Sequence, residues 1–287
     1  MASTPSRLTL AAQAAAREAG VEVRDLRTDE MAEASALFAQ VWGLAPRESP
    51  MEPGLLVALA FAGSYVSGAF DADGTMVGAC SGFLGTASGH TLLHSHIAGV
   101  RPGSGRGIGT ALKVHQRAWC AERGIATIAW TYDPLIARNA WFNLGRLGAH
   151  VEAYLVDFYG RMDDGLNAGE ESDRLLVHWP VEPEVVPPAG ATEPERPHAA
   201  LVAGEDGAPV AHPAVPVDAD AVTLAVPSDV EALRTSSRAT ASRWRSAFRD
   251  AYADLHEQGW RVRRFAREGH YVLGRTTGGQ EPMGAHA

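Results

Sequence analysis

The sequence predicts an α/β (α+β) fold, and three observations lead to this class. Strand-like and helix-like patterns alternate along most of the 287 residues. A glycine-rich segment at 99–109 joins an apolar strand pattern to a helical one. Another strand pattern, at 125–132, follows that helix, as in the crossover that joins two parallel strands. We therefore expect a mixed sheet flanked by helices.

The composition narrows the classes of protein to consider. With 46% hydrophobic residues, a chain of this length can bury one substantial core and a smaller second one. Its net charge of −9 argues against a general nucleic-acid binder, and Cys80 and Cys120 make no disulfide framework. No apolar run approaches the roughly 18 residues of a membrane span. We expect a cytoplasmic enzyme with no nucleic-acid or membrane partner.

The first half of the chain shows clear local patterns. The N-terminal segment 1–20 is Ala-rich and interrupted by charged residues, which indicates a short helix and not a signal peptide. Alternation, capping signals and a hairpin signal then define the next elements. They are a strand at 21–26, a helix from Thr28 to Val41, a loop at 42–53, and strands at 55–70 and 76–84.

Two groups of reactive side chains in the next strands have alternative interpretations. Cys80 lies in a Gly-Ala-Cys-Ser-Gly sequence that superficially matches a nucleophile elbow, but a strand pattern follows where an elbow needs a helix. We expect Cys80 to be buried packing. His94 and His96 share one face of the strand at 91–100, with His90 near its start. They are satisfied core or rim histidines, a proton acceptor for an amine substrate, or zinc ligands.

The glycine-rich segment has the geometry of an anion site. Glycines at 105, 107 and 109 allow the backbone to approach a ligand closely, just where a helix is expected to begin at Ile108. Arg106 adds a charge-assisted contact. The spacing fails both the dinucleotide fingerprint and the Walker loop, because Thr110 replaces a required glycine and Lys113 lies inside the helix. A plain glycine-rich turn is the alternative to a phosphate site.

The run Val-Arg-Pro followed by Gly-Arg-Gly-Ile-Gly-Thr-Ala-Leu resembles the acyl-CoA-binding motif of the GNAT acyltransferases, Q/R-x-x-G-x-G/A, with Ser104 where the family has Gln or Arg. The resemblance implies a GNAT fold, whose mixed sheet is splayed around acyl-CoA with the pantetheine in the gap between two strands. Acetyl-CoA or another acyl-CoA is then the co-substrate. The residues implied to bind it are Gly99, Val100, Gly105, Arg106, Gly107, Ile108, Gly109, Thr110 and Asn139.

The helix expected at 136–147 departs from the family. Asn139 matches an asparagine that the family places near the pantetheine, whereas the usual catalytic tyrosine falls on Leu144. The proton for the leaving thiolate then comes from Tyr132, Tyr154, Tyr159 or solvent. His96 and Asp133 are the expected catalytic residues, since each could take a proton from the acceptor amine. An Asx-type turn before Pro134 is the alternative role of Asp133.

The predicted domains follow from these patterns. They are an N-terminal helical segment at 1–20, an acyltransferase domain at 21–180, a Pro-rich linker or insertion at 181–220, and a C-terminal αβ extension at 221–287. The residue pattern from 130 to 174 resembles a predicted-acetyltransferase branch of the superfamily with such an extension. In the extension, Arg238, Arg245 and Arg249 share a helical face, which is either solvated or attracts an anion.

The expected function is transfer of an acetyl or succinyl group from a CoA thioester to the amine of a small molecule, such as an amino acid. The amine attacks directly, without an acyl-enzyme. A homodimer is a possible assembly. Two alternatives stay open: a CoA-binding regulatory protein without turnover, and a metal hydrolase using His90, His94 and His96.

Overall fold

The computed structural model describes residues 6–87, 89–160, 171–182 and 197–275. The chain forms two compact units, which are described separately. Unit 1 comprises the described residues of Met1–Trp130 and Pro180–Glu184, and unit 2 those of Thr131–Trp179 and Val185–Ala287.

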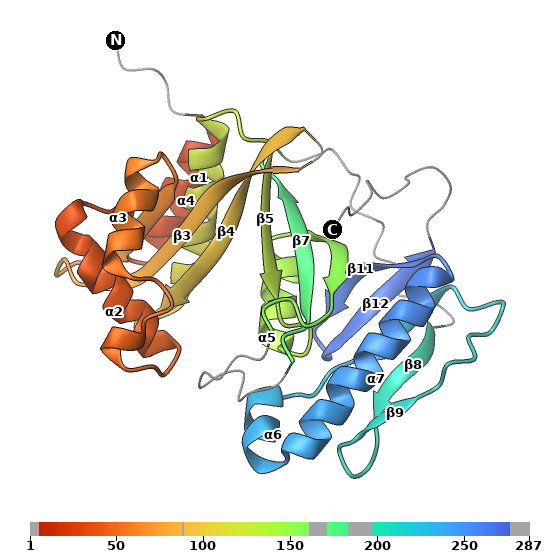
Figure 1. Cartoon of the computed structure of the whole chain (residues 1–287). Coiled ribbons are helices and arrows are strands. Elements are labelled where there is room, and N and C mark those ends of the chain that lie inside the picture. Colours follow the sequence, from red (N-terminus) through yellow and green to blue (C-terminus); the bar gives the residue numbers. More distant parts are fainter. Residues whose placement is uncertain (1–5, 88, 161–170, 183–196, 276–287) are drawn as a thin grey trace. The chain divides into compact units, whose positions relative to one another are not determined.

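Unit 1 is built on strands β1 to β5 (Figure 1). Neighbouring strands from β1 to β4 pair antiparallel, in chain order, whereas β5 pairs parallel to β4. The helix that joins β4 to β5 makes the expected crossover. The strands are β1 (Glu22–Asp25), β2 (Tyr65–Phe70), β3 (Met76–Ala87), β4 (His90–Val100) and β5 (Thr127–Tyr132), within which the unit boundary falls.

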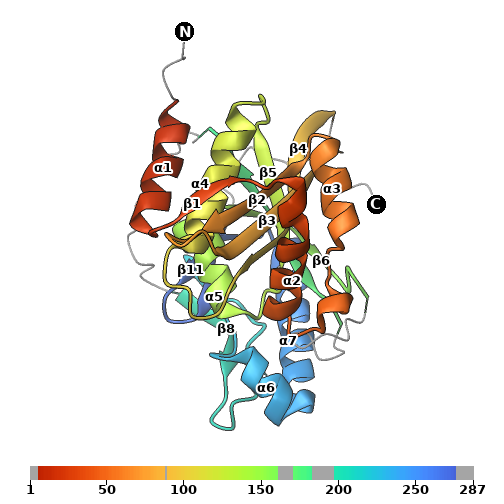
Figure 2. The ribbon, with the colours of Figure 1, turned by 90° about the vertical axis from the view of Figure 1, so that its left-hand side faces the viewer.

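Helices cover both faces of this sheet, which Figure 2 shows for α1 and α4 on one side and α2 and α3 on the other. A Cβ at Gly78 would meet Ile108 and Leu112 of α4, and one at Gly99 would meet Phe38 and Val41 of α2. The core under α2 and α3 is apolar. These helices are α1 (Arg7–Glu18), α2 (Met31–Val41), α3 (Pro53–Phe61) and α4 (Ile108–Ala121), with short 3-10 turns η1 (Thr28–Glu30) and η2 (Pro46–Glu48).

The strand predicted at 55–70 is wrong in its first half. Residues Pro53–Phe61 form α3, and β2 begins only at Tyr65. A continuous apolar run fits a buried strand and a helix equally well. Pro53 at the first helical turn and the Leu- and Ala-rich sequence after it favour the helix.

Unit 2 begins with the end of β5 and contains two sets of paired strands. β6 and β7 pair antiparallel, and a second sheet has the order β11-β12-β10-β8-β9. In that sheet β10 is parallel to β8, and the other pairs are antiparallel. The strands are β6 (His150–Leu155), β7 (Arg174–Pro180), β8 (Pro197–Ala203), β9 (Pro209–Ala211), β10 (Ala221–Ala225), β11 (Trp260–Ala266) and β12 (His270–Arg275).

The long helix α7 covers the second sheet through a stripe of large side chains. Trp244, Phe248, Tyr252 and Leu255 recur every three or four residues and are all buried. Asp229 caps the shorter helix before it, with its side chain accepting from the amide of Ala232 at 2.9 Å. The helices of unit 2 are α5 (Ala137–Ala140), the π-helix η3 (Trp141–Arg146), α6 (Val230–Ser236) and α7 (Arg238–Glu257).

The α/β class with a mixed sheet flanked by helices is confirmed, and the two compact units divide the chain at other points than the predicted domains. The boundary at Trp130 falls inside the acyltransferase domain expected at 21–180. The linker predicted at 181–220 contains β8 and β9, which belong to the sheet of the extension. Prolines at 197 and 209 stand at the first residues of these strands, where their missing N–H groups are tolerated.

Among the described residues, no helix combines the length and the apolar character needed to cross a membrane.

Candidate functional site

The loop between β4 and α4 has the backbone conformation that the glycines predict. Gly103, Gly105 and Gly107 have φ values of 83°, 102° and 89°, which residues with a Cβ rarely adopt. Gly107 is the N-cap of α4, and no side chain caps this helix. Left-handed residues within a turn are a feature of the nests in which consecutive amides bind an anion.

The amides of this loop are available to a ligand. Within the described residues, none of the backbone amides from Gly105 to Thr110 donates a hydrogen bond to a protein acceptor. The amide of Ser104 bonds the Arg101 carbonyl at 3.2 Å, and that of Ala111 bonds the Gly107 carbonyl at 2.9 Å. The available donors are therefore bounded on both sides, and they coincide with the positive end of the α4 dipole.

Space around the loop also fits a ligand. A Cβ built at Gly103 or Gly105 would meet nothing within 4 Å, and one at Gly107 would meet only Ala19, at 3.3 Å from its Cβ. Gly103 and Gly105 are therefore required by the backbone conformation and not by internal packing, whereas at Gly107 a side chain would also crowd Ala19. Arg106 lies between Gly105 and Gly107, exposed, where its guanidinium can reach an anion.

The edge of β4 is open beyond a short pairing with β5. The parallel pairing joins Leu93 to Ile128 and His94 to Ala129, and β4 continues to Val100. The amide of Arg101 donates to the Val77 carbonyl of β3 at 2.8 Å. Since antiparallel ladders alternate, the amide of Gly99 also faces β3, whereas that of Val100 faces the open edge.

Of Gly99 and Val100, which the resemblance implies to bind acyl-CoA, only Val100 therefore has an amide on the open edge. Gly99 serves packing instead. A Cβ there would lie 3.3–3.4 Å from Trp42, Val41 and Phe38, so that the glycine lets α2 approach the strand.

The histidines of β4 lie at a β-bulge. The register between β3 and β4 shifts between Ser81 and Gly82, so His96 is the extra residue of β4. His96 is exposed and its ring lies 5.7 Å from that of Phe83, which stacks on His94 at 5.0 Å. Partial desolvation by the surrounding protein lowers the pKa of His96, and burial together with His96 and Lys113 lowers that of His94 to about 4. Both are neutral at pH 7, and His96 is the better placed to accept a proton.

The sequence analysis did not single out Lys113 as a functional residue. This residue is the only lysine of the chain, and it is 5% exposed. Its Nζ donates to Ser95 Oγ at 2.8 Å and to Gln116 Oε1 at 3.1 Å, and it lies 3.9 Å from the Trp130 ring centroid. Burial lowers its pKa to about 8. A lysine and a glutamine three residues apart on the mainly apolar face of α4 were the available signal.

Cys80 extends the same buried cluster. Gln116 Nε2 donates to Cys80 Sγ at 3.4 Å, and burial raises the pKa of the thiol. A buried thiol of raised pKa inside a strand is not a nucleophile. The prediction that Cys80 is buried is confirmed.

The structure does not bring the histidines of β4 together as a metal site. Among the described residues, the group of three ligand atoms close enough to share an ion is that of His150, Glu152 and His178 in unit 2. The zinc interpretation of His90, His94 and His96 therefore has no support from the geometry.

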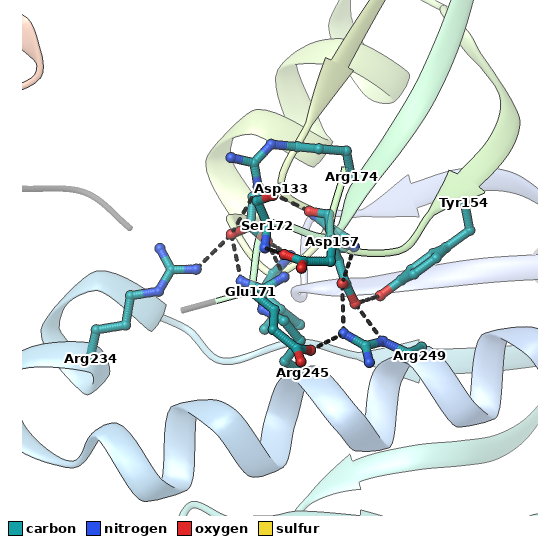
Figure 3. A network of polar contacts seen from close by, with 12 residues as sticks. Asp133, Tyr154, Asp157, Glu171, Ser172, Arg174, Arg234, Arg245 and Arg249 are labelled. Carbon is teal, nitrogen blue, oxygen red and sulfur yellow. Dashed lines mark hydrogen bonds and ion pairs between the residues drawn. The ribbon is translucent and has the colours of Figure 1, made fainter. Parts of the chain in front are cut away.

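In unit 2, Asp133 is the centre of a buried ionic cluster (Figure 3). Arg245 Nη2 and Arg234 Nη2 lie 2.8 and 2.5 Å from Asp133 Oδ2, and Arg174 Nη1 lies 3.9 Å away. Asp133 Oδ1 also accepts from the amide of Leu135 at 3.0 Å. Burial would raise the pKa of Asp133, but the arginines outweigh it and hold that pKa far below its usual range.

These contacts argue against the predicted role of Asp133 as a base. A carboxylate that is 4% exposed and shared among three guanidiniums neither gains nor releases a proton near neutral pH. The alternative, an Asx-type turn before Pro134, is confirmed by the hydrogen bond to Leu135. The sequence could not show this, because the three arginines are 41 to 112 positions away.

A second carboxylate cluster adjoins the first in Figure 3. Asp173 is fully buried and accepts from Tyr154 Oη at 2.6 Å and from Arg249 at 2.7 and 2.9 Å. Arg249 also bonds Glu171. Arg245 and Arg249 are thus ion-paired inside unit 2, so the interpretation of the shared face as solvated is wrong for these two residues, whereas Arg238 is exposed.

The three tyrosines that were considered as acids differ in their surroundings. Burial raises the pKa of Tyr132, whose hydroxyl bonds Tyr271 at 3.3 Å. Burial and the Asp173 carboxylate raise that of Tyr154. Tyr159 is 41% exposed and its hydroxyl lies 3.1 Å from Thr131 Oγ1. Of the three, Tyr159 is the one accessible to solvent.

Asn139 and Leu144 lie on a helix that changes from α-helical to π-helical hydrogen bonding between them. Asn139 is half-buried in α5, and Leu144 is buried in the π-helix η3. Within η3 the ring of Trp141 covers Gly145, where a Cβ would lie 2.7 Å from the indole. π-helical turns are frequent at functional sites, but the predicted contact of Asn139 with the pantetheine stays a prediction.

A cavity of about 520 Å³ lies elsewhere in unit 1, between α1, β1 and α4. Its lining includes Arg17, Asp25 and His115, and none of the predicted site residues. His115 Nδ1 is already 2.9 Å from the hydroxyl of Tyr65.

Comparison with known proteins gives structural similarities only. No protein-family model and no curated protein match this chain. Its structure is similar to Naa50 from Arabidopsis thaliana with a bisubstrate analogue, at 19% identity and a TM-score of 0.44 over 55% of this chain and 97% of that chain. It is also similar to the ribosomal-protein-S18-alanine N-acetyltransferase from Escherichia coli, at 16% identity and a TM-score of 0.44 over 57% of this chain and 96% of that chain. A GNAT superfamily phosphinothricin acetyltransferase from Sinorhizobium meliloti with AcCoA is similar at 17% identity and a TM-score of 0.45, over 56% of this chain and 88% of that chain.

Proposed function

We propose that this chain is an acyl-CoA-dependent N-acyltransferase of the GNAT type, which transfers an acetyl or succinyl group to the amine of a small molecule such as an amino acid. The loop before α4 carries the proposal, because six consecutive amides from Gly105 to Thr110 have no acceptor within the described residues. A diphosphate offers acceptor oxygens and negative charge to such a row of donors.

The other parts of the reaction would fall on β4. The bound thioester supplies an activated carbonyl carbon. The amide of Val100, on the open edge of β4, would donate to the carbonyl oxygen as negative charge develops there. His96 would accept the proton of the attacking amine, because its imidazole is exposed at the bulge and neutral at pH 7.

The leaving thiolate does not require a strong general acid from the protein. A thiol has an ordinary pKa of about 8.5, so its thiolate leaves without a strong acid nearby. Leu144 in place of the usual tyrosine is therefore compatible with turnover. Because positioning of the amine supplies much of the rate, we propose direct attack without an acyl-enzyme.

Substitution of Gly107 by Glu tests the diphosphate site. The new carboxylate would place a negative charge in the loop and impose a side chain on a left-handed backbone position. We expect Gly107→Glu to weaken CoA binding at least 100-fold in isothermal titration. Gly74→Glu is the control for the left-handed backbone conformation, because Gly74 has a φ of 79° and no part in the loop. Unchanged affinity in a folded Gly107→Glu protein would contradict the proposal.

Turnover is tested separately from binding. Free thiol should accumulate when acetyl-CoA or succinyl-CoA meets the correct amine in a panel of amino acids and polyamines. His96→Gln should lower kcat by about 10² to 10⁴ with CoA affinity unchanged, whereas His90→Gln, at the exposed start of β4, should leave both unchanged. Tight CoA binding with no thiol release for any amine would favour a regulatory CoA-binding protein.

A further inference from the structure

Two histidines and a glutamate meet on the strands β6 and β7 of unit 2. His150 and His178 are directly opposite each other in the antiparallel register. The register then shifts between Val151 and Ala153, so Glu152 is the extra residue of a β-bulge. Because a bulge re-aims the side chain that it carries, the carboxylate of Glu152 comes to the face of the histidine pair.

The distances suit one shared ion. One ligand atom of each residue lies within 4.8 Å of the other two, and His178 Nδ1 is 3.8 Å from Glu152 Oε2. The two imidazole rings are 6.1 Å apart at an interplanar angle of 79°, so they are not stacked. Ligands bound at 2.0–2.2 Å in a tetrahedral shell lie about 3.4 Å from each other. Small rotations of the three side chains would therefore close the shell.

The side chains of these residues contact one another. Within the described residues, no side-chain hydrogen bond joins any of the three to another part of the protein. The side chains of His178 and Glu152 are 20% and 27% exposed, so an ion could enter from solvent and keep a water ligand. This differs from Asp133 and Asp173, whose oxygens are already bonded to arginines.

We propose that His150, Glu152 and His178 bind one divalent transition-metal ion of the zinc type, with solvent in the fourth position. Imidazole nitrogens combined with one carboxylate favour zinc over magnesium or calcium, which prefer oxygen ligands throughout. The ion would join β6 to β7 across the register shift. This site is independent of the proposed acyl transfer.

Titration of the untagged, chelator-treated full chain with zinc sulfate tests the site. We expect one zinc per chain with micromolar or tighter affinity, a melting temperature several degrees higher with zinc, and no effect of magnesium at the same concentration. His178→Gln and Glu152→Gln should each weaken zinc binding at least tenfold, since each removes a ligand. His94→Gln, the matched control on β4, should leave it unchanged and also tests the alternative histidine site.

Cobalt provides a test that needs no variant. Bound to the unaltered chain, Co²⁺ should give the intense visible absorption of a four-coordinate site, and zinc should displace it. Three results would overturn the proposal: no stoichiometric zinc, zinc binding insensitive to His178→Gln and Glu152→Gln, or only the weak absorption of six-coordinate cobalt.

Discussion

The loop before α4 and the cluster around Asp133 use polar groups in opposite ways. In the loop, the donors from Gly105 to Thr110 have no acceptor within the described residues. At Asp133, one buried carboxylate is shared by Arg174, Arg234 and Arg245 and by a backbone amide. A candidate ligand site therefore differs from polar groups that stabilise the fold mainly in whether its donors and acceptors are already bonded within the protein. The chemical type of the residues matters less. Four experiments can break or sharpen this comparison.

The largest expected effect is that of Asp133→Ala. Removing this carboxylate leaves guanidiniums buried without the charge that they share, and breaking a buried ion pair costs about 3–5 kcal/mol of unfolding free energy. Urea unfolding followed by tryptophan fluorescence measures it. If instead Asp133→Ala keeps its stability and loses only turnover, Asp133 is a catalytic residue and the structural interpretation is wrong.

Lys113 should give a pH-dependent stability of up to about 3 kcal/mol. Its pKa falls from 10.5 to about 8 on folding, so the unfolded chain binds more protons between these values. The contribution of Lys113 to the free energy of unfolding should therefore rise as pH increases from about 8 to 10.5, and it is measured as the difference between the unaltered chain and Lys113→Met at each pH. Because Lys113 is the only lysine, NMR of lysine-labelled protein follows its titration directly. A midpoint near 10.5 would contradict the burial argument.

Gly82→Ala should cost about 1–3 kcal/mol, as overpacking commonly does. Its Cβ would lie 2.7 Å from the His94 carbonyl oxygen and 3.1 Å from Ser95 Cα, both backbone atoms beside the bulge. Gly82→Ala should lower the melting temperature and, if the bulge positions His96, the rate of turnover as well. Gly85→Ala, on the same strand, is the control, because its Cβ would meet only Leu92 Cδ1 at 3.7 Å. Equal stability of the two variants would show that the backbone of β4 shifts to accommodate the added methyl group at little energetic cost.

The smallest effect is expected for Glu231→Gln. Glu231 is bonded to Arg138, whose side chain is 64% exposed, and exposed ion pairs contribute about 0–1 kcal/mol. We therefore expect this exposed carboxylate–guanidinium pair to contribute severalfold less than Asp133, which is buried and shared by three arginines. Chemical denaturation in low and high salt measures both the size and the screening of this contribution. A loss comparable to that of Asp133→Ala would refute the distinction.

Local patterns predicted most elements, and long-range contacts account for what they missed. Alternation and turn signals located β10 and the hairpin of β11 and β12, because strands have a two-residue period. The Pro-rich composition concealed β8, since a strand edge tolerates proline at its first residue.

The candidate site divides in the same way. The left-handed loop could be predicted because only glycine tolerates those φ values. The buried, ion-paired role of Asp133 could not be predicted, because its partners come from β7, α6 and α7. The bulges at His96 and Glu152 likewise depend on register, which a single sequence does not show.

The strand order β11-β12-β10-β8-β9 bears on how this protein can be cut for study. An expression fragment starting at residue 221 would keep β10 but lose its parallel neighbour, leaving an unpaired row of amides and carbonyls on an apolar strand. Such an edge is a template for aggregation. Fragments of the C-terminal part should therefore begin before Pro197, so that β8 and β9 are retained.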